Sequence, residues 1–285
     1  MKKILIDISE HNGVVDLSLA KSTISGVVAR CSWGWGSKQI DEQWNNNAYQ
    51  ANKLNIPLYA YHFCYARTVD EARKEAKLAL KACEKYKVNV IYYDMEYSSF
   101  QGDLTSDELY LIAKTFCDSI ENAGYSVGIY ANEDWFRNKL IHSGFSAWTL
   151  WIANYGANDG YDNWNGELQY NPFGNVLLHQ FTSKAKAGLL KEIKGIPSNN
   201  LDANVDYGLL SVFNNQKENY KNLKYSVGDV VSFDRLYLSS MGSEYVTDLL
   251  YFKGEITYVD EGALNPYLIN GEDGWCNDKS IIFLE

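Results

Sequence analysis

The sequence predicts a closed α/β barrel followed by a small all-β module. Three observations support this prediction. Apolar runs of strand length alternate with amphipathic helical segments up to about residue 142, a pattern typical of successive β/α units. Beyond that point strand-like runs continue, but the segments between them lose their helical period. From Tyr225 onward the chain holds only short strand-like runs separated by turn residues.

Eight runs in the first part of the chain have the composition of strands, and the first five are almost continuously apolar. Parallel strands that are covered on both faces have this composition. The eight runs are Ile4–Ile8, Val27–Ser32, Leu58–Cys64, Val90–Tyr97, Val127–Asn132, Leu150–Tyr155, Val176–Thr182 and Leu201–Asp206. They predict five β/α units followed by three further strands, which close into a TIM-like barrel with an incomplete ring of helices.

Three segments between these runs predict helices: Asp41–Leu54, Val69–Tyr86 and Leu104–Ala123. The second has small and apolar residues on a single stripe, with glutamates ahead of lysines at helical spacing. The third begins with capping and acidic residues and stops at Gly124. The stretch Gly156–Asn175 is rich in Gly and Asn and shows no helical period, so an irregular connection is expected there.

A polar segment at Asn214–Asn219 predicts a linker between two domains. We assign residues 1–210 to the barrel, 211–224 to the linker and 225–285 to the all-β module. Residues 221–285 include 5 basic and 11 acidic side chains, which gives this part a net charge of 5 − 11 = −6. Such a charge disfavours binding to an anionic polymer.

The composition excludes several classes of partner. The chain has 36 acidic and 26 basic residues and a net charge of −10, whereas nucleic-acid binding needs Lys and Arg for the phosphates. No apolar run approaches the roughly 18 residues of a membrane span, so membrane insertion is not expected. The apolar stretch Ile4–Ile6 is too short for the core of a signal peptide, which predicts synthesis in a cytoplasm.

Neither a metal nor a cofactor is expected. The five cysteines are odd in number, widely spaced and without a Cys-x-x-Cys pair, which argues against a disulfide framework or a zinc cluster. The four histidines do not lie near cysteines or carboxylates at the spacing of metal ligands. His62 and His179 are flanked by apolar strand residues and are expected in the core.

The strongest local signal for chemistry is the pair Asp94 and Glu96 at the end of the fourth predicted strand. In a strand, residues i and i+2 point to one face, with Cα atoms about 6.5–7 Å apart. Two buried acids aimed at one spot are costly to ionise together, so one pKa should rise. Glycosidases need this pairing of a proton donor with a carboxylate. Alternatively, one of the two caps the following helix or pairs with a basic side chain.

Further acids occur on the first and last predicted strands, which are neighbours in a closed barrel. Asp7 lies near the end of the first strand, and Asp202, Asn204 and Asp206 share one face of the last. Barrel active sites lie at the carboxyl ends of the strands, so acids from separate strands are expected at one mouth. Aromatic side chains on the inner strands can stack on sugar rings there or simply pack the barrel core. These residues are Tyr59, Tyr61, Phe63, Tyr130, Trp151 and Tyr155.

An ordered set of motifs over most of residues 1–210 resembles glycoside hydrolase family 25, the lysozymes often found among phage endolysins and bacterial autolysins. The motifs are Asp7-Ile8-Ser9 with Asn12-Gly13, Val27–Arg30 with Ser32 and Gly34, Asn47 and Ala51, Ala60–Phe63, Glu75-Ala76, Asp94-Met95-Glu96, Gly128–Tyr130, Leu150–Tyr155, His179–Ser183 and Leu201–Asn204. The family's fold, five β/α units closed by three further strands, agrees with the strand count above.

The resemblance implies an N-acetylmuramidase that hydrolyses the β-1,4 bond after N-acetylmuramic acid in peptidoglycan. It assigns Glu96 as the general acid and Asp94 as the carboxylate that positions the substrate's 2-acetamido group, with retention of configuration. Asp7 and Asp202 resemble the outer acids that tune this pair. The residues implied to line the sugar subsites are Tyr61, Phe63, Tyr130, Trp151, Tyr155 and Gln180.

One departure from the family concerns the fourth acid. The interval between Gln180 and Asp202 is longer than expected, through an insertion around Lys184–Lys194. Asp202-Ala203-Asn204 matches the family's Asp-x-Asn, whereas Asp206-Tyr207-Gly208 does not. The choice between Asp202 and Asp206 nevertheless stays open on the sequence alone.

The all-β module resembles bacterial SH3-like wall-binding domains. The residues that carry this resemblance are Val227–Val230, Gly254–Ile256, Gly262–Ile269 and Gly274-Trp275. The resemblance implies a receptor in the bacterial wall, and the acidic charge favours a neutral peptide or glycan. The whole chain is then expected to be an endolysin of a phage with a Gram-positive host, acting on the cell wall after release from the cytoplasm.

Two alternatives remain from the residues themselves. One alternative is a glycosidase for another N-acetylated glycan, such as chitin. It is disfavoured because chitinases that cleave by the same mechanism carry a longer acidic run, Asp-x-x-Asp-x-Asp-x-Glu, and this chain has Tyr92 in place of one of its acids. A non-catalytic wall-binding protein is disfavoured because all four acids are retained.

Overall fold

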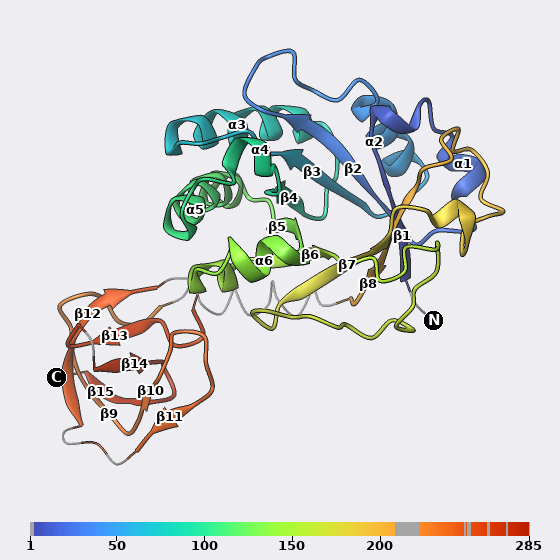
Figure 1. Ribbon diagram of the computed structural model, residues 1–285. Coiled ribbons are helices and arrows are strands. Elements are labelled where there is room, and N and C mark those ends of the chain that lie inside the picture. The colour runs from blue at the N-terminus through green and yellow to red at the C-terminus, as the bar shows by residue number, and fades with distance from the viewer. Residues whose placement is uncertain are drawn as a thin grey trace. The chain divides into compact units, whose positions relative to one another are not determined.

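The computed structural model describes residues 3–208, 223–247, 249, 252–260, 263–271 and 273–284. The chain divides into two compact units, Met1–Leu209 and Leu210–Glu285. The first holds a closed barrel of eight strands and the second a seven-stranded sheet (Figure 1). This confirms the predicted barrel with a second, all-β part. The linker predicted at residues 211–224 lies outside the described residues, apart from Leu223 and Lys224.

The barrel strands follow one another in chain order. They are β1 (Lys3–Ile8), β2 (Gly26–Trp33), β3 (Leu58–Phe63), β4 (Ile91–Asp94), β5 (Val127–Asn132), β6 (Thr149–Ala153), β7 (Val176–Thr182) and β8 (Asp202–Asp206). The first seven are parallel to their neighbours, whereas β8 is antiparallel to both β7 and β1. Its first residue therefore lies at the end of the barrel where the other strands finish.

Helices cover the connections after the first five strands. They are α1 (Leu17–Ala20), α2 (Trp44–Lys53), α3 (Val69–Cys83), α4 (Ser98–Gln101), α5 (Ser106–Asn122) and α6 (Glu133–Asn138), with short 3-10 turns η1 (Glu10–Asn12), η2 (Ser143–Ala147) and η3 (Ala185–Ala187). Capping boxes at Thr68 and Thr105 start α3 and α5, which pack side by side (Figure 1). The connection between β6 and β7 contains no helix within its described residues, as its Gly- and Asn-rich composition predicts.

The barrel interior is filled by aromatic side chains, so it is a packed core and not a channel. The ring of Trp151 lies 5.8 Å from that of Tyr61, 5.4 Å from Tyr92 and 4.2 Å from Tyr130. The Nε1–H of Trp151 donates to Oδ1 of Asn204 at 2.7 Å, which satisfies both buried polar groups. This layer forms the floor beneath the carboxyl ends of the strands.

A second buried polar cluster lies outside the barrel, between the strands and α3. Oγ of Ser32 and Nδ1 of His62 are 2.7 Å apart. Glu75 of α3 accepts from the backbone N–H of Tyr65 at 2.8 Å and from the hydroxyl of Tyr93 at 2.5 Å. His62 and Glu75 are both fully buried. The predicted core positions of His62 and His179 are thus confirmed by their burial.

Seven short strands lie within the described residues of the second unit. They are β9 (Val230–Phe233), β10 (Leu236–Tyr237), β11 (Tyr245–Val246), β12 (Lys253–Val259), β13 (Tyr267–Ile269), β14 (Gly274–Cys276) and β15 (Ile281–Leu284), in the sheet order β11-β10-β14-β13-β12-β9-β15. Their pairings are antiparallel. The small core is formed by Val231, Phe233, Leu236, Ile256, Tyr267, Ile269, Cys276 and Ile281.

Within the described residues, none of the helices combines the length and the apolar character that a membrane crossing requires.

Candidate active site

Four acids converge at the carboxyl end of the barrel. Asp7 is the penultimate residue of β1, Asp94 is the last residue of β4, and Asp202 is the first residue of β8. The register places Asp7 directly opposite Asp202. Glu96 acts electrostatically on Asp7, Asp94 and Asp202. The sequence-predicted convergence of acids from three strands therefore occurs in the structure.

The fourth strand is shorter than predicted, and this corrects the position of Glu96. β4 ends at Asp94, so Glu96 is not on the strand face. The backbone N–H of Met95 still donates to the backbone carbonyl of Tyr130 at 2.8 Å, but a turn from Glu96 to Ser98 then leads into α4. The prediction that Asp94 and Glu96 share one face of a strand is therefore wrong, although both acids do reach the site. Glu96 instead reaches the site from the turn, where Nδ2 of Asn132 donates to its Oε2 at 3.2 Å.

Burial raises the pKa values of all four acids, and the charges of neighbouring acids raise those of Asp7, Asp94 and Asp202 further. Desolvation by burial is the largest cause in each case. The charge of Asp202 further raises the pKa of Asp7, and the charge of Glu96 further raises that of Asp94. Burial together with the charge of Glu96 raises the pKa of Asp202 to about 6. The four carboxyls thus resist ionising together.

Asp94 presents a free acceptor to this site. Its side chain is 4% exposed, and its buried Oδ1 has no hydrogen-bond partner among the described residues. A buried carboxylate oxygen without a donor is costly, and active sites are where such groups are found. A ligand that brings an N–H or O–H group to this oxygen would satisfy it.

Arg30 is the basic residue of the site, and sequence reasoning missed its role. It lowers the pKa values of Asp7 and Asp94. Its Nε donates to Asp41 at 2.8 Å, and its Nη2 lies 2.7 Å from Glu10. The signal available in the sequence was a charged residue inside the apolar run Val27–Ser32. Asn132, which bonds Glu96, was missed as well, because its contact depends on the pairing of β4 with β5.

The predicted lining residues differ in how much surface they present. Trp151, Gln180 and Tyr130 are buried, with 1%, 1% and 6% of their surface exposed. Tyr61, Phe63 and Tyr155 are partly exposed. Only Tyr61, Phe63 and Tyr155 therefore present open faces.

Beside Phe63, three further aromatic side chains form a cluster that sequence reasoning did not single out. Tyr65, Tyr97 and Phe100 join Phe63 with ring centroids 5.2–5.8 Å apart. Tyr65 follows β3, and the other two follow β4, so the cluster lies next to Asp94 and Glu96 in the chain. Partly exposed rings of this kind suit contact with apolar faces of a polar ligand.

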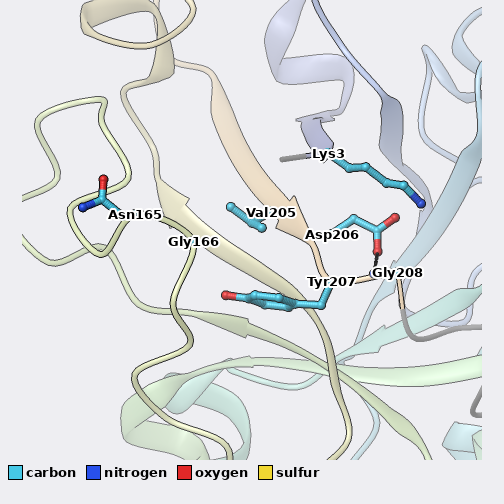
Figure 2. A pocket seen from close by; sticks show the side chains of 7 residues that line it. All are labelled: Lys3, Asn165, Gly166, Val205, Asp206, Tyr207 and Gly208. Carbon is cyan, nitrogen blue, oxygen red and sulfur yellow. Dashed lines mark hydrogen bonds between the residues drawn. The ribbon is translucent and has the colours of Figure 1, made fainter. Parts of the chain in front are cut away.

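The opposite end of the barrel holds a separate pocket of about 420 Å³ (Figure 2). It is lined by Lys3, Asn165, Gly166, Val205, Asp206, Tyr207 and Gly208, and includes none of the four acids. Asp206 pairs with Lys3 in the register and accepts from the backbone N–H of Gly208 at 2.6 Å. Four residues of strand, about 13 Å, separate Asp206 from Asp202. The geometry therefore favours Asp202 over Asp206 as the fourth acid.

The described part of the chain contains no group of three or more His, Cys, Asp or Glu side chains arranged to hold a metal ion. The polar groups gathered at this site are carboxyls, an amide, hydroxyls and one guanidinium.

Comparison with known proteins identifies the class to which this fold and site belong. The sequence profile of glycosyl hydrolases family 25 matches residues 6–188. The chain belongs to this family. The match includes Asp7, Asp94 and Glu96, whereas Asp202 lies beyond it. Comparison with curated protein sequences gives no match.

Solved structures share the fold. The modular autolysin LytC from Streptococcus pneumoniae, in complex with a synthetic peptidoglycan ligand, is 26% identical with a TM-score of 0.58 over 72% of this chain and 47% of LytC. The chain thus spans about half the length of that autolysin. The catalytic domain of endolysin ply40, from a bacteriophage of Listeria monocytogenes, is 22% identical with a TM-score of 0.59 over 74% of this chain and 95% of the domain. The spore cortex lytic enzyme SleM from Clostridium perfringens is 18% identical with a TM-score of 0.61 over 84% and 74%.

Proposed function

We propose that this chain is a lysozyme of the N-acetylmuramidase type, which cleaves the β-1,4 bond between N-acetylmuramic acid and N-acetylglucosamine in peptidoglycan. The observation that carries the proposal is the buried Asp94 and the half-buried Glu96, which lie beside two further acids at the barrel mouth. Family membership supports glycosidic chemistry. The synthetic peptidoglycan ligand bound by the pneumococcal autolysin supports this choice of polymer.

The environment of Glu96 suits a general acid. Burial raises its pKa, so the protonated form persists to higher pH than for an exposed glutamate. In the first step Glu96 donates its proton to the leaving glycosidic oxygen as the bond from C1 breaks. Hydrogen bonds from Asn132 lower the pKa and keep the carboxyl oriented.

Asp94 is placed to act on the substrate's 2-acetamido group. Its unpartnered Oδ1 accepts the acetamido N–H, which turns the acetamido carbonyl oxygen toward C1. That oxygen forms a bond to C1 as the leaving group departs, giving an oxazolinium intermediate. Water then attacks C1 from the opposite face, Glu96 takes the proton of the water, and the bond from the acetamido oxygen breaks. Two inversions at C1 retain the configuration.

Asp7 and Arg30 act on the charge state of Asp94, and Asp202 acts on that of Asp7. Asp7 and Asp202 raise the cost of further negative charge, and Arg30 offsets part of that cost. The partly exposed rings of Tyr61, Phe63 and Tyr155 would then contact the sugars, while Trp151 and Tyr130 support them from below.

The reducing ends released from purified peptidoglycan test this function. The proposal predicts new ends on N-acetylmuramic acid, and loss of about 10²–10⁴-fold in rate for Glu96→Gln. The matched control is Glu84→Gln, an exposed glutamate after α3, which should cleave like the unaltered chain. New ends on N-acetylglucosamine, or cleavage of chitin but not peptidoglycan, would contradict the proposal. A chain that releases no ends at all would support the non-catalytic alternative.

We further propose that residues 225–285 form an SH3-like module that binds the bacterial wall, with residues 1–210 as the catalytic domain. A row of side chains supports this role. Tyr245, Tyr237, Trp275, Leu268 and Tyr258 are directly opposed, one pair after another, across β11, β10, β14, β13 and β12. Directly opposed residues point to one face of a sheet, and this face is not the one that forms the core.

The charges around this row favour an uncharged sugar polymer as its ligand. Tyr245 and Tyr258 are about half exposed, with 49% and 52% of their surface open. Arg235 stacks at 4.9 Å over Tyr245, but its charge is paired with Asp234 at 2.7 Å. With a net charge of −6 around it, the row is unsuited to an anionic wall polymer. Adjacent strands are about 4.8 Å apart, a step comparable to one sugar of a β-1,4 chain, so the glycan strand itself fits.

Binding to purified, polymer-stripped peptidoglycan tests the row. Trp275→Ala with Tyr258→Ala should weaken sedimentation of the full chain with these walls by at least about tenfold, since two stacking contacts are lost. Phe283→Ala, an exposed aromatic on β15 outside the row, is the matched control. Equal loss in the control, or binding that requires the anionic polymers, would refute the assignment.

The biological setting that fits both parts is an endolysin of a phage with a Gram-positive host, which acts on the cell wall after release. A catalytic barrel joined to a glycan-binding module suits an enzyme that works on an insoluble polymer. Finding the protein outside intact, unlysed host cells would count against this setting.

A further inference from the structure

Gln180 of β7 links four polar residues of the site through one side chain. Its Nε2 donates to Oδ2 of Asp7 at 2.8 Å and to Oδ2 of Asp202 at 3.3 Å. Its Oε1 accepts from the hydroxyls of Tyr130 at 2.9 Å and Tyr155 at 2.8 Å. We propose that Gln180 is a positioning residue, which fixes how the two outer acids and the two tyrosine hydroxyls present their hydrogen-bonding atoms. The inference rests on the muramidase function proposed above.

These contacts use all of the hydrogen-bonding groups of the Gln180 amide. A glutamine amide has two N–H donors and two oxygen lone pairs, and each is matched here by one partner. The side chain is 1% exposed, so water does not compete for these groups. Gln180 is therefore bound on all sides by the site and cannot rotate without breaking several bonds together.

The chemistry of the partners decides which way the amide faces. While these acids are ionised they can accept hydrogen bonds but not donate them, so Nε2 faces Asp7 and Asp202. The amide oxygen then faces the two tyrosines, which are left to donate. Burial raises the pKa values of both Tyr130 and Tyr155, so their hydroxyls keep the proton that they donate.

This orientation links the outer acids to the central glutamate. With its proton committed to Gln180, the oxygen of the partly exposed Tyr155 retains a lone pair that can accept from a substrate hydroxyl or amide. Both tyrosines lie within electrostatic range of Glu96. Gln180 therefore acts through its neighbours and needs no contact with the sugar.

The same orientation depends on the charge of the outer acids. Protonation of Asp7 or Asp202 gives that acid a proton to donate, and Nε2 cannot accept it. The hydrogen bond from Gln180 lowers the pKa of Asp7, against burial and the charge of Asp202. The amide thus favours the ionised outer acids, and the ionised acids in turn hold the amide.

A second buried glutamine provides the structural comparison. Gln101 is fully buried, and its Nε2 donates to Sγ of Cys64 at 3.0 Å and to the carbonyl of Ala66 at 2.6 Å. None of these partners is an acid of the site. Loss of the Gln101 amide should therefore reduce stability alone.

The experiment compares Gln180→Met with Gln101→Met in the full chain, on soluble peptidoglycan fragments. For Gln180→Met we expect kcat to fall about 10–100-fold, the range for a residue that orients functional groups, with a smaller change in KM. The acid limb of the pH profile should move to higher pH, because Asp7 loses a bond that lowers its pKa. For Gln101→Met the profile of the folded protein should stay where it is.

A double variant tests whether Gln180 acts through the tyrosines. Adding Tyr155→Phe to Gln180→Met should cost much less than Tyr155→Phe alone costs in the unaltered chain, because the bond is already gone. Fully additive losses, or an unmoved acid limb in Gln180→Met, would overturn the proposal and leave Gln180 a packing residue.

A measurement on the unaltered chain covers the case in which Gln180→Met fails to fold. The ¹⁵N resonance of the Gln180 side-chain amide should shift with pH in step with the acid limb, while that of Gln101 stays constant. A pH-independent Gln180 resonance would contradict the proposal. If the chain cleaves no peptidoglycan, the muramidase function fails, but this titration still decides whether Gln180 senses the outer acids.

Discussion

A single buried carboxylate lies outside the barrel wall and four acids gather at the barrel mouth, and the two sites differ in their partners. Outside the wall, Glu75 accepts from Tyr65 and Tyr93, and His62 lies 3.7 Å from its Oε2. Inside, Asp7, Asp94, Glu96 and Asp202 face one another, and the charges of their neighbours raise several of their pKa values. A single acid surrounded by donors stabilises a fold, whereas several acids that share few donors cost stability and are retained for chemistry.

The largest effect on stability is expected at Glu75, outside the barrel wall. Glu75→Leu leaves the Tyr93 hydroxyl, the Tyr65 N–H and His62 without their partner, which should cost about 3–5 kcal/mol of unfolding free energy. Because the acids inside the barrel are untouched, activity per folded molecule should change little. Denaturant unfolding and specific activity together check this, and a loss of activity without a loss of stability would erase the contrast between the two sites.

At Asp202, one of the four acids at the barrel mouth, we expect a smaller effect on stability, and of opposite sign. The pKa of Asp202 is about 6 in the folded chain, against 3.8 for the free side chain. The folded state therefore holds this proton more tightly than the unfolded state, and stability falls as pH rises from about 4 to about 6.

Asp202→Asn removes that cost. At pH 7 the variant should be more stable than the unaltered chain by about 1–3 kcal/mol, since one pKa unit corresponds to about 1.4 kcal/mol. Near pH 4 the two should be equally stable, and activity should fall at every pH. Thermal unfolding at both pH values provides the measurement. A gain that is the same at pH 4 and pH 7 would mean that ionisation of Asp202 is not its cause.

The smallest effect on stability and activity is expected at Asp206, at the other end of β8. Asp206→Asn keeps an oxygen for the Gly208 N–H and loses only the long 3.4 Å contact with Tyr59. Stability should change by less than about 1 kcal/mol, and cleavage should be unaffected. If Asp206→Asn inactivated the enzyme and Asp202→Asn did not, the assignment of the fourth acid would be reversed.

The strands were largely predictable because their composition reflects burial on both faces. β5 and β7 have the predicted bounds, whereas β4 ends three residues before the predicted Tyr97. The error has a physical reason. Tyr97 has the composition of a strand residue, but its ring packs with Phe63 and Phe100 beside the site.

The position of the fourth acid could not be predicted because it depends on the direction of β8. In a parallel strand, Asp206 would lie at the mouth of the barrel. β8 is antiparallel, which brings its first residue, Asp202, to that end instead. Composition does not encode strand direction, so only the register in the folded protein shows which of Asp202 and Asp206 lies at the mouth of the barrel.

The polar residues that connect the site were hardest to predict. Arg30 and Asn132 reach the acids through strand pairing that no local pattern specifies. Gln180 was predicted as a sugar-lining residue, yet its amide is buried and bound on all sides. Its place was visible in the sequence, whereas its partners were not.

The convergence of these acids on one site is tested most directly by ¹³C NMR, which measures the titration of the site's carboxyls in the unaltered chain and in Glu96→Gln. The charge of Glu96 raises the pKa values of Asp7, Asp94 and Asp202, which lie on three different strands. Its removal should therefore lower all three pKa values together. Unchanged titration of Asp7 and Asp202 would contradict the convergence of these acids on one site.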